Sequence, residues 1–193
     1  MINHLNIALI GFGNVGRHYL DIFRKYKNVK KIFIVDLLRD KKKEKFCTFL
    51  TFKDLIKKKV IIDYAIICTP SGSHFEYAKY FLEKRVPTLI EKPFVISLKH
   101  AKELIKIKKR KNVKCWVAFQ NRYNKSIIMG KKILEKNRFG KAFFVDAALY
   151  WHRDKKYYSS SWRGKYLSDG GVLFNQSIHL LDILIYFFGK VKN

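Results

Sequence analysis

The chain has 193 residues, of which 48% are hydrophobic and 16% aromatic. This composition excludes a disordered protein and predicts one complete domain with part of a second. The formal net charge of +26 is of the size seen in nucleic-acid-binding proteins. We expect no specific nucleic-acid binding, because the lysines are scattered over predicted helix faces and do not gather with aromatic residues along a groove. A milder attraction of an anionic cofactor or a diphosphate-bearing substrate fits the charge.

No targeting or membrane segment is predicted. The apolar run Leu5–Ile10 is too short and wrongly flanked for a signal peptide. The late apolar stretch Ile178–Phe188 is interrupted by His179 and Asp182 and is shorter than the ~20 residues that span a bilayer. The three cysteines are widely separated and lack metal-ligand spacing, which is typical of reduced thiols. The sequence predicts a cytoplasmic protein without a metal site.

Short apolar runs alternate with helical segments up to residue 121, the pattern of parallel strands covered by helices on both faces. Strands are expected at residues 5–10, 31–36, 63–68, 88–90 and 115–119, and helices at about 15–26, 73–84 and 98–111. The pattern predicts an α/β fold, a Rossmann doubly wound parallel sheet over residues 1–121.

The pattern changes beyond this point. A helix is expected at about 126–136, a long strand at 141–151, and an apolar helix that opens at Gly170-Gly171 and reaches about Phe188. We expect residues 122–193 to form an incomplete α+β substrate and oligomerisation domain, with only its first sheet strand and the active-site helix.

The first predicted strand is followed by G-F-G-N-V-G at residues 11–16, the G-x-G-x-x-G pattern of a dinucleotide-binding turn in its strand-turn-helix context. In this pattern Gly11 permits the tight turn, Gly13 lets the backbone approach the pyrophosphate, and Gly16 lets the helix pack closely. The pyrophosphate then meets the N-terminus of the helix. The residues predicted to bind the cofactor here are Gly11, Gly13, Asn14, Val15 and Gly16.

Asp36 lies twenty residues beyond Gly16, at the end of the second predicted strand. A carboxylate at this point accepts hydrogen bonds from the adenosine ribose and repels a 2′-phosphate. The sequence therefore predicts NAD as the cofactor, with NADP less favoured. Arg39 nearby leaves some tolerance of NADP open.

Two further motifs follow strands, T-P-S-G-S-H at residues 69–74 and E-K-P at residues 91–93. Ligands of open α/β sheets bind at these carboxyl ends. Together with Q-N-R-Y-N at 120–124, W-R-G at 162–164 and D-G-G-V-L-F-N-Q-S-I-H-L-L-D at 169–182, the motifs resemble those of the Gfo/Idh/MocA family of sugar and polyol dehydrogenases. The resemblance covers essentially the whole chain.

The resemblance implies a role for each matching residue. Glu91 is implied to contact the nicotinamide ribose, Lys92 to be catalytic, and His179 to act as an acid or base. Pro70 and His74 are implied to line the nicotinamide side of the cofactor cleft, and Thr69 is implied to bind the cofactor. Residues implied to bind the substrate are Arg122, Trp162, Arg163 and Asn175.

Lys92 and His179 each also have a simpler explanation as a surface or core residue. A partly desolvated Lys92 beside an oxidised nicotinamide can exchange a proton with a substrate hydroxyl, although a lysine in so basic a chain is ordinarily a surface residue. A lone histidine on an apolar helix is more often a core residue. His179 lies, however, on a polar stripe with Asn175, Asp182 and Tyr186. Because burying such a stripe without partners is costly, we expect it to face a cleft.

Many family members carry Asp where this chain has Asn175, so a His–carboxylate relay through that position is excluded. Asn175 would instead orient the substrate or His179. The N-Q-S-I-H form, with W-R-G upstream, resembles the branch that acts on UDP-linked amino sugars and their uronates, notably 3-dehydrogenases.

The expected function is NAD(P)-dependent oxidation or reduction of a secondary hydroxyl of a sugar, with a nucleotide-linked amino sugar or its uronate as substrate. Alternatives are an inositol or polyol dehydrogenase of the same family, a family hydrolase or lyase that uses NAD transiently, a non-catalytic NAD-binding remnant, or a nucleic-acid binder. Family members are longer and build their second domain on a mainly antiparallel sheet. We therefore expect a C-terminally truncated member with weak or absent turnover, and a homo-oligomer in the full-length form.

Overall fold

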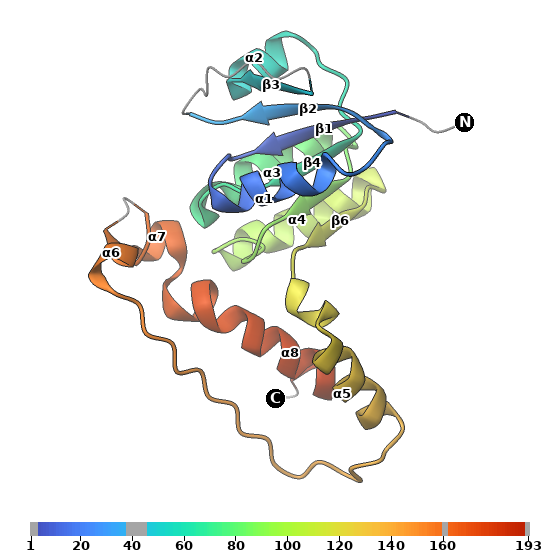
Figure 1. The fold of residues 1–193 in the computed structure, drawn as a ribbon, viewed down its shortest axis with the longest axis vertical. Coiled ribbons are helices and arrows are strands. Elements are labelled where there is room, and N and C mark those ends of the chain that lie inside the picture. Colours follow the sequence, from blue (N-terminus) through green and yellow to red (C-terminus); the bar gives the residue numbers. More distant parts are fainter. Residues whose placement is uncertain (1–3, 38–45, 160–161, 192–193) are drawn as a thin grey trace. The chain divides into compact units, whose positions relative to one another are not determined.

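The computed structural model describes residues 4–37, 46–159 and 162–191 (Figure 1). Arg39 lies outside these residues. The chain splits into two compact units, Met1–Val117 and Ala118–Asn193. The boundary predicted at residue 121 falls inside the second unit, because the last strand ends at Val117 and the 3₁₀ turn Gln120–Tyr123 packs on the C-terminal helix.

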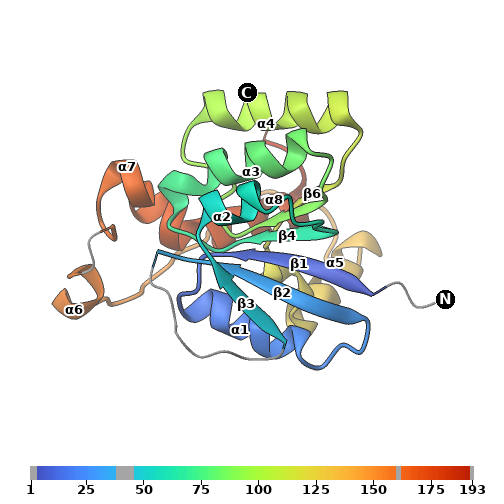
Figure 2. The same ribbon diagram turned by 90° about the horizontal axis from the view of Figure 1, so that it is seen from above.

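The first unit is built on a sheet of six parallel strands in the order β3-β2-β1-β4-β5-β6 (Figure 2). The strands are β1 (Leu5–Ile10), β2 (Val29–Val35), β3 (Cys47–Leu50), β4 (Tyr64–Ile67), β5 (Thr88–Ile90) and β6 (Cys115–Val117). Ile10 of β1 lies opposite Val35 of β2 and Ile67 of β4, and Ile67 lies opposite Ile90 of β5. Four strands therefore end level, and the strand order reverses between them, which makes this edge the ligand-binding edge of the predicted Rossmann fold.

Helices cover both faces of the sheet (Figure 2). One face packs on α1 (Asn14–Phe23), and the other on α2 (Phe52–Lys57), α3 (His74–Glu83) and α4 (Leu98–Lys111). Side chains alternate along β1: Leu9 belongs to the core under α1 with Leu20, whereas Ile10 belongs to the core under α3 with Phe81. This two-sided burial explains the continuous apolar strands of the sequence.

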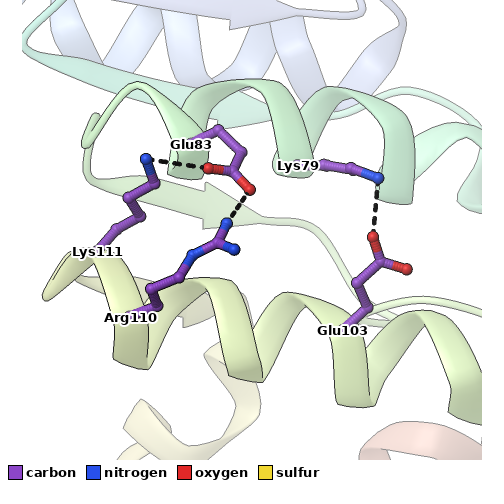
Figure 3. A network of polar contacts seen from close by, with 5 residues as sticks. All are labelled: Lys79, Glu83, Glu103, Arg110 and Lys111. Carbon is purple, nitrogen blue, oxygen red and sulfur yellow. Dashed lines mark hydrogen bonds and ion pairs between the residues drawn. The ribbon is translucent and has the colours of Figure 1, made fainter.

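Ion pairs join the exposed sides of α3 and α4 (Figure 3). Lys79 Nζ lies 2.8 Å from Glu103 Oε1, and Glu83 pairs with both Arg110 and Lys111. The two cations of α4 lie in its last turn, where they also complement the helix dipole. These exposed pairs add little stability. They place three of the basic residues in ordinary surface contacts.

The sequence pattern missed β3 and α2. α2 begins with a capping box: Thr51 Oγ1 accepts the Asp54 N–H at 3.1 Å, and Asp54 Oδ2 accepts the Thr51 N–H at 3.1 Å. This T-x-x-D pattern is a readable helix start. The strand itself has only four residues, so its periodicity is too short to stand out.

The described residues of the second unit form helices joined by turns and irregular segments. Its helices are α5 (Lys125–Glu135), α6 (Lys155–Tyr158), α7 (Tyr166–Asp169) and α8 (Ile178–Phe188), with a π-helical turn at Leu173–Ser177. α5 and α8 pack closely, since a Cβ on Gly130 would lie 3.3 Å from the Phe187 ring.

The strand predicted at residues 141–151 is wrong for this structure. The segment is irregular and every one of its residues is exposed, including Phe143, Phe144 and Tyr150. A strand exists only as part of a hydrogen-bonded ladder, and no described segment of the second unit lies beside this one to form it. The segment has the apolar residues typical of a strand, but it belongs to no sheet in the described part of the chain.

The stretch Tyr166–Phe188 is longer than the apolar helix predicted from the sequence. It is interrupted by two left-handed glycines, Gly170 (φ +78°) and Gly171 (φ +73°), and by the π turn. By length and composition it could cross a membrane, a weak criterion that core helices of soluble proteins also meet.

Candidate cofactor and active site

The glycine turn after β1 is shaped by close backbone contacts. A Cβ on Gly11 (φ +92°) would lie 2.8 Å from the Cys68 carbonyl, and one on Gly16 would lie 2.2 Å from the Gly11 oxygen. At Gly13, by contrast, an added Cβ would meet no described atom within 4 Å. The turn is therefore closed toward the protein and open at Gly13, where a ligand can approach the backbone.

The N-terminus of α1 fits an anion. Gly13 is its N-cap, and among the described residues no side chain caps the first turn and no acidic residue lies in it. Asn14 and Val15 are exposed there. The first backbone N–H groups and the positive end of the helix dipole thus remain for an anionic group, as a dinucleotide pyrophosphate requires.

Asp36 directly follows β2 and contacts the glycine turn. Its Oδ2 accepts the Phe12 backbone N–H at 2.6 Å. The predicted ribose-binding carboxylate therefore lies beside the predicted pyrophosphate-binding turn. This is the arrangement that an adenosine ribose would need.

The T-P-S-G-S-H segment follows β4. Pro70 is exposed, and Thr69 Oγ1 accepts a hydrogen bond from Ser73 Oγ at 2.8 Å. His74 is only 1% exposed, with Nδ1 2.9 Å from the Pro93 oxygen and Nε2 2.8 Å from the Thr69 oxygen. Burial lowers the pKa of His74. His74 is therefore buried and links the loop after β4 to the loop after β5. The resemblance implied instead that it lines the cleft.

The E-K-P segment follows β5. Glu91 Oε1 accepts a hydrogen bond from Tyr19 Oη at 3.0 Å, and Oε2 accepts the Lys92 N–H at 3.3 Å. Burial raises the pKa of Glu91, against the opposing effect of the Tyr19 hydrogen bond. Lys92 is half-buried, and the Lys92–Pro93 peptide is cis. Sequence reasoning missed Tyr19, whose only signal is its place one turn beyond Gly16 on α1.

The second unit holds the polar stripe of the last helix. Arg122 donates to both oxygens of Asp182, from Nε at 2.7 Å and from Nη2 at 2.5 Å, and its guanidinium lies 5.0 Å from the Tyr186 ring centre. Asn175 Nδ2 donates to Tyr157 Oη at 3.3 Å. Partners within the unit thus satisfy much of the stripe that was expected to face a cleft.

His179 is the second residue of α8, directly after the π turn that contains Asn175. It is half-buried, and its ring lies edge-on to Phe119 with the ring centres 6.3 Å apart. π-helical turns are frequent at functional sites, because they change which side chains face one direction. The stripe was predicted from regular α-helical spacing, which could not show this turn.

Two arginines stack on Tyr157. The Arg163 guanidinium lies 4.5 Å and that of Arg153 4.8 Å from its ring centre, and each also lies over a tryptophan, Trp162 at 5.0 Å and Trp151 at 3.9 Å. The result is a cationic and aromatic cluster on the same unit as His179. The sequence pointed to Trp162 and Arg163 but missed the other three members.

Among the described residues no group of three or more His, Cys, Asp or Glu could hold a metal ion. The residues predicted to act lie in both units. The glycine turn, Asp36, Thr69, Pro70, Glu91 and Lys92 belong to one edge of the first sheet, and Arg122, Trp162, Arg163, Asn175 and His179 belong to the second unit.

Comparison with known families gives two matches in chain order. Residues 5–119 match the model of an oxidoreductase family with an NAD-binding Rossmann fold, and residues 128–193 match the model of a GFO/IDH/MocA C-terminal domain. Among curated proteins, the uncharacterized oxidoreductase YhhX of Escherichia coli is 26% identical over 96% of this chain and 54% of its own length. Oxidoreductase P35 of Formosa agariphila is 25% identical over the whole chain and 63% of its own length. The chain thus spans about half to two thirds of these relatives.

Solved structures share the fold over nearly the whole chain. The WlbA dehydrogenase from Bordetella pertussis, in complex with NADH and UDP-GlcNAcA, is 25% identical with a TM-score of 0.88, over 98% of this chain and 57% of its own. The apo scyllo-inositol dehydrogenase from Lactobacillus casei is 20% identical with a TM-score of 0.76, over 98% and 56% of the two chains.

Proposed function

The chain belongs to the Gfo/Idh/MocA oxidoreductases, and from this we propose that its protein transfers hydride between NAD and a secondary hydroxyl of a sugar. We propose a nucleotide-linked amino sugar or its uronate as the substrate. The observation that carries the reaction is the level edge of the sheet, where the open glycine turn follows β1, Asp36 follows β2 and the Glu91-Lys92 pair follows β5.

The first unit has the parts that NAD needs. Bound NAD would supply the hydride acceptor or donor. In the proposal, the first turn of α1 binds the pyrophosphate, Asp36 accepts the adenosine ribose hydroxyls, and Glu91 accepts those of the nicotinamide ribose. The negative charge of Asp36 disfavours the 2′-phosphate of NADP.

Proton transfer falls to this chain's own side chains. Lys92 follows the nicotinamide-side Glu91 and is half-buried, so its amine can take the proton of a substrate hydroxyl. His179 is the second candidate. Asn175, four residues earlier in the π turn, is an amide that can orient either partner but cannot accept the proton. The two residues are assigned as alternative or successive proton carriers.

The cluster around Tyr157 supports a charged substrate. Two guanidinium groups with aromatic rings suit a diphosphate or a carboxylate and a flat base. An inositol offers neither charge nor base, so it would leave this cluster without a role. The WlbA structure, which shares the fold at a TM-score of 0.88, contains a nucleotide-linked uronate. An inositol or polyol dehydrogenase remains the second candidate, favoured by the fold shared with scyllo-inositol dehydrogenase.

The test compares turnover of UDP-N-acetylglucosaminuronate with that of scyllo-inositol by NADH absorbance, in wild type and Arg163→Gln. We expect turnover of the charged substrate, with a raised KM in the variant. Preference for inositol, unaffected by the variant, would transfer the proposal to the polyol branch. NADH binding without turnover of either substrate would indicate a non-catalytic remnant. We further propose that the protein is cytoplasmic and forms homo-oligomers.

A further inference from the structure

Tyr19 connects two functional segments of the first unit that are far apart in the sequence. It lies on α1, one turn beyond Gly16, and its hydroxyl donates to Glu91 Oε1 across 72 residues of chain at 3.0 Å. Its ring stacks on Phe23 with the ring centres 6.0 Å apart. α1, which begins at the glycine turn, therefore contacts Glu91, the residue directly after β5.

The bond leaves Glu91 able to bind a ligand. A carboxylate has about four lone-pair positions. Tyr19 uses one on Oε1, and the Lys92 N–H uses one on Oε2. About two positions remain, enough for a ribose diol. The hydroxyl also limits the rotation of the half-buried Glu91 side chain, whose other hydrogen bond among the described residues is with the backbone of its neighbour Lys92.

We propose that Tyr19 is a positioning residue, which holds the Glu91 carboxylate in the orientation that accepts the nicotinamide-ribose hydroxyls. The inference rests on the proposed role of Glu91. Tyr19 acts through Glu91 and does not itself contact the cofactor. Nothing in the glycine pattern assigns a function to this position.

The charge state of Glu91 gives the inference a measurable signature. Burial raises the pKa of Glu91, and the hydrogen bond from Tyr19 lowers it. Removing the hydroxyl takes away the lowering contribution, so the pKa of Glu91 rises further. Since the ionised carboxylate is the better acceptor, NADH binding by a Tyr19→Phe variant should fall off at a higher pH than in wild type.

The experiment titrates NADH by fluorescence over a pH series in wild type, Tyr19→Phe, Glu91→Gln and the double variant. ADP serves as a second ligand, because it contains the pyrophosphate and the adenosine ribose but lacks the nicotinamide ribose. Tyr26→Phe is the matched control, since Tyr26 lies just beyond the same helix and is 57% exposed.

We expect Tyr19→Phe to weaken NADH binding up to about tenfold, because binding would then have to order a Glu91 side chain that the hydroxyl no longer holds. The pH below which NADH binding weakens should be higher than in wild type. ADP affinity should be unchanged. The double variant should bind NADH no more weakly than Glu91→Gln, because both substitutions disrupt the same interaction, that of the Glu91 carboxylate with the nicotinamide ribose. Tyr26→Phe should behave as wild type.

Three results would overturn the inference. Unchanged NADH affinity and pH profile in Tyr19→Phe would show that the hydroxyl has no role. Loss of ADP binding as well would show a structural role in α1. Additive losses in the double variant would show that Tyr19 does not act through Glu91. If Glu91→Gln itself binds NADH as wild type does, the proposed role of Glu91 fails together with the inference, a different outcome from failure of Tyr19 alone.

Discussion

The Asp36 carboxylate accepts the Phe12 backbone N–H at 2.6 Å, so the end of β2 is fastened to the glycine turn that follows β1. The bond joins the two halves of the motif read from the sequence. It also means that Asp36 has two functions, one in holding the turn and one proposed in binding the adenosine ribose. The first prediction separates them.

Asp36→Ala should weaken NADH binding about tenfold or more and reduce or reverse the preference over NADPH, because a charge-assisted acceptor is lost and a 2′-phosphate is no longer repelled. Dissociation constants for both cofactors give the ratio. Asp63→Ala is a matched control. Asp63 Oδ2 also accepts a backbone N–H, that of Asn6 at 2.7 Å, but at the opposite end of β1. An equal effect of both variants on the ratio would contradict the assignment.

The glycine turn predicts opposite consequences for two similar changes. Gly16→Ala should destabilise the apo protein, because its Cβ would lie 2.2 Å from the Gly11 oxygen. Gly13→Ala should leave the melting temperature nearly unchanged, since its Cβ meets open space, yet abolish tight NADH binding by occupying the space of the pyrophosphate. Thermal melts and NADH titrations of both variants decide the matter. Normal NADH affinity in Gly13→Ala would place the pyrophosphate elsewhere.

Lys92→Met and His179→Ala should each lower kcat by about 10² or more and leave the NADH dissociation constant nearly intact, as expected of proton-transfer groups. Lys84→Met, an exposed lysine of the same unit, is the control for charge. Asn175→Asp tests whether the position tolerates a carboxylate, and a mild effect would show that it does. Full turnover in either of the first two variants would remove that residue from the mechanism.

The sequence predicted the first unit well because its signals are local and repeated. The strand Leu5–Ile10, the helix Leu98–Lys111 and the glycine turn have the ranges expected. Motifs at strand ends could be placed together because parallel strands end at one edge. Tyr19 could not be found in this way, since its contact with Glu91 depends on how α1 packs across the sheet. The second unit shows the other limit. Residues 141–151 have the composition of a strand, but a strand also needs a neighbour that composition does not supply.

His74 predicts a pH dependence of stability. Burial lowers its pKa in the folded state below the usual value near 6.5. The folded protein therefore binds fewer protons than the unfolded chain, and stability present above about pH 6.5 is lost as the pH falls through the folded-state pKa. His74→Gln should flatten this acid-side loss in thermal melts. His18→Gln, a change at an exposed histidine of α1, is the matched control. The same acid-side loss in both variants would show that other groups titrate there.

The pair of Arg122 and Asp182 predicts an asymmetry in stability. Asp182 is 7% exposed, whereas the Arg122 side chain is 38% exposed. Arg122→Ala would leave a carboxylate buried without its charge partner, a loss of about 3–5 kcal/mol in comparable sites. Asp182→Asn would leave a guanidinium that water can reach, so the cost should be smaller, about 1–2 kcal/mol. Urea unfolding of the two variants gives both free energies. A larger loss in Asp182→Asn, or equal losses, would mean that Arg122 is more desolvated than its exposure indicates. If Arg122 also contacts the substrate through its remaining N–H groups, Arg122→Lys should raise KM and keep most of the stability. A lysine preserves the charge but cannot form the bidentate contact.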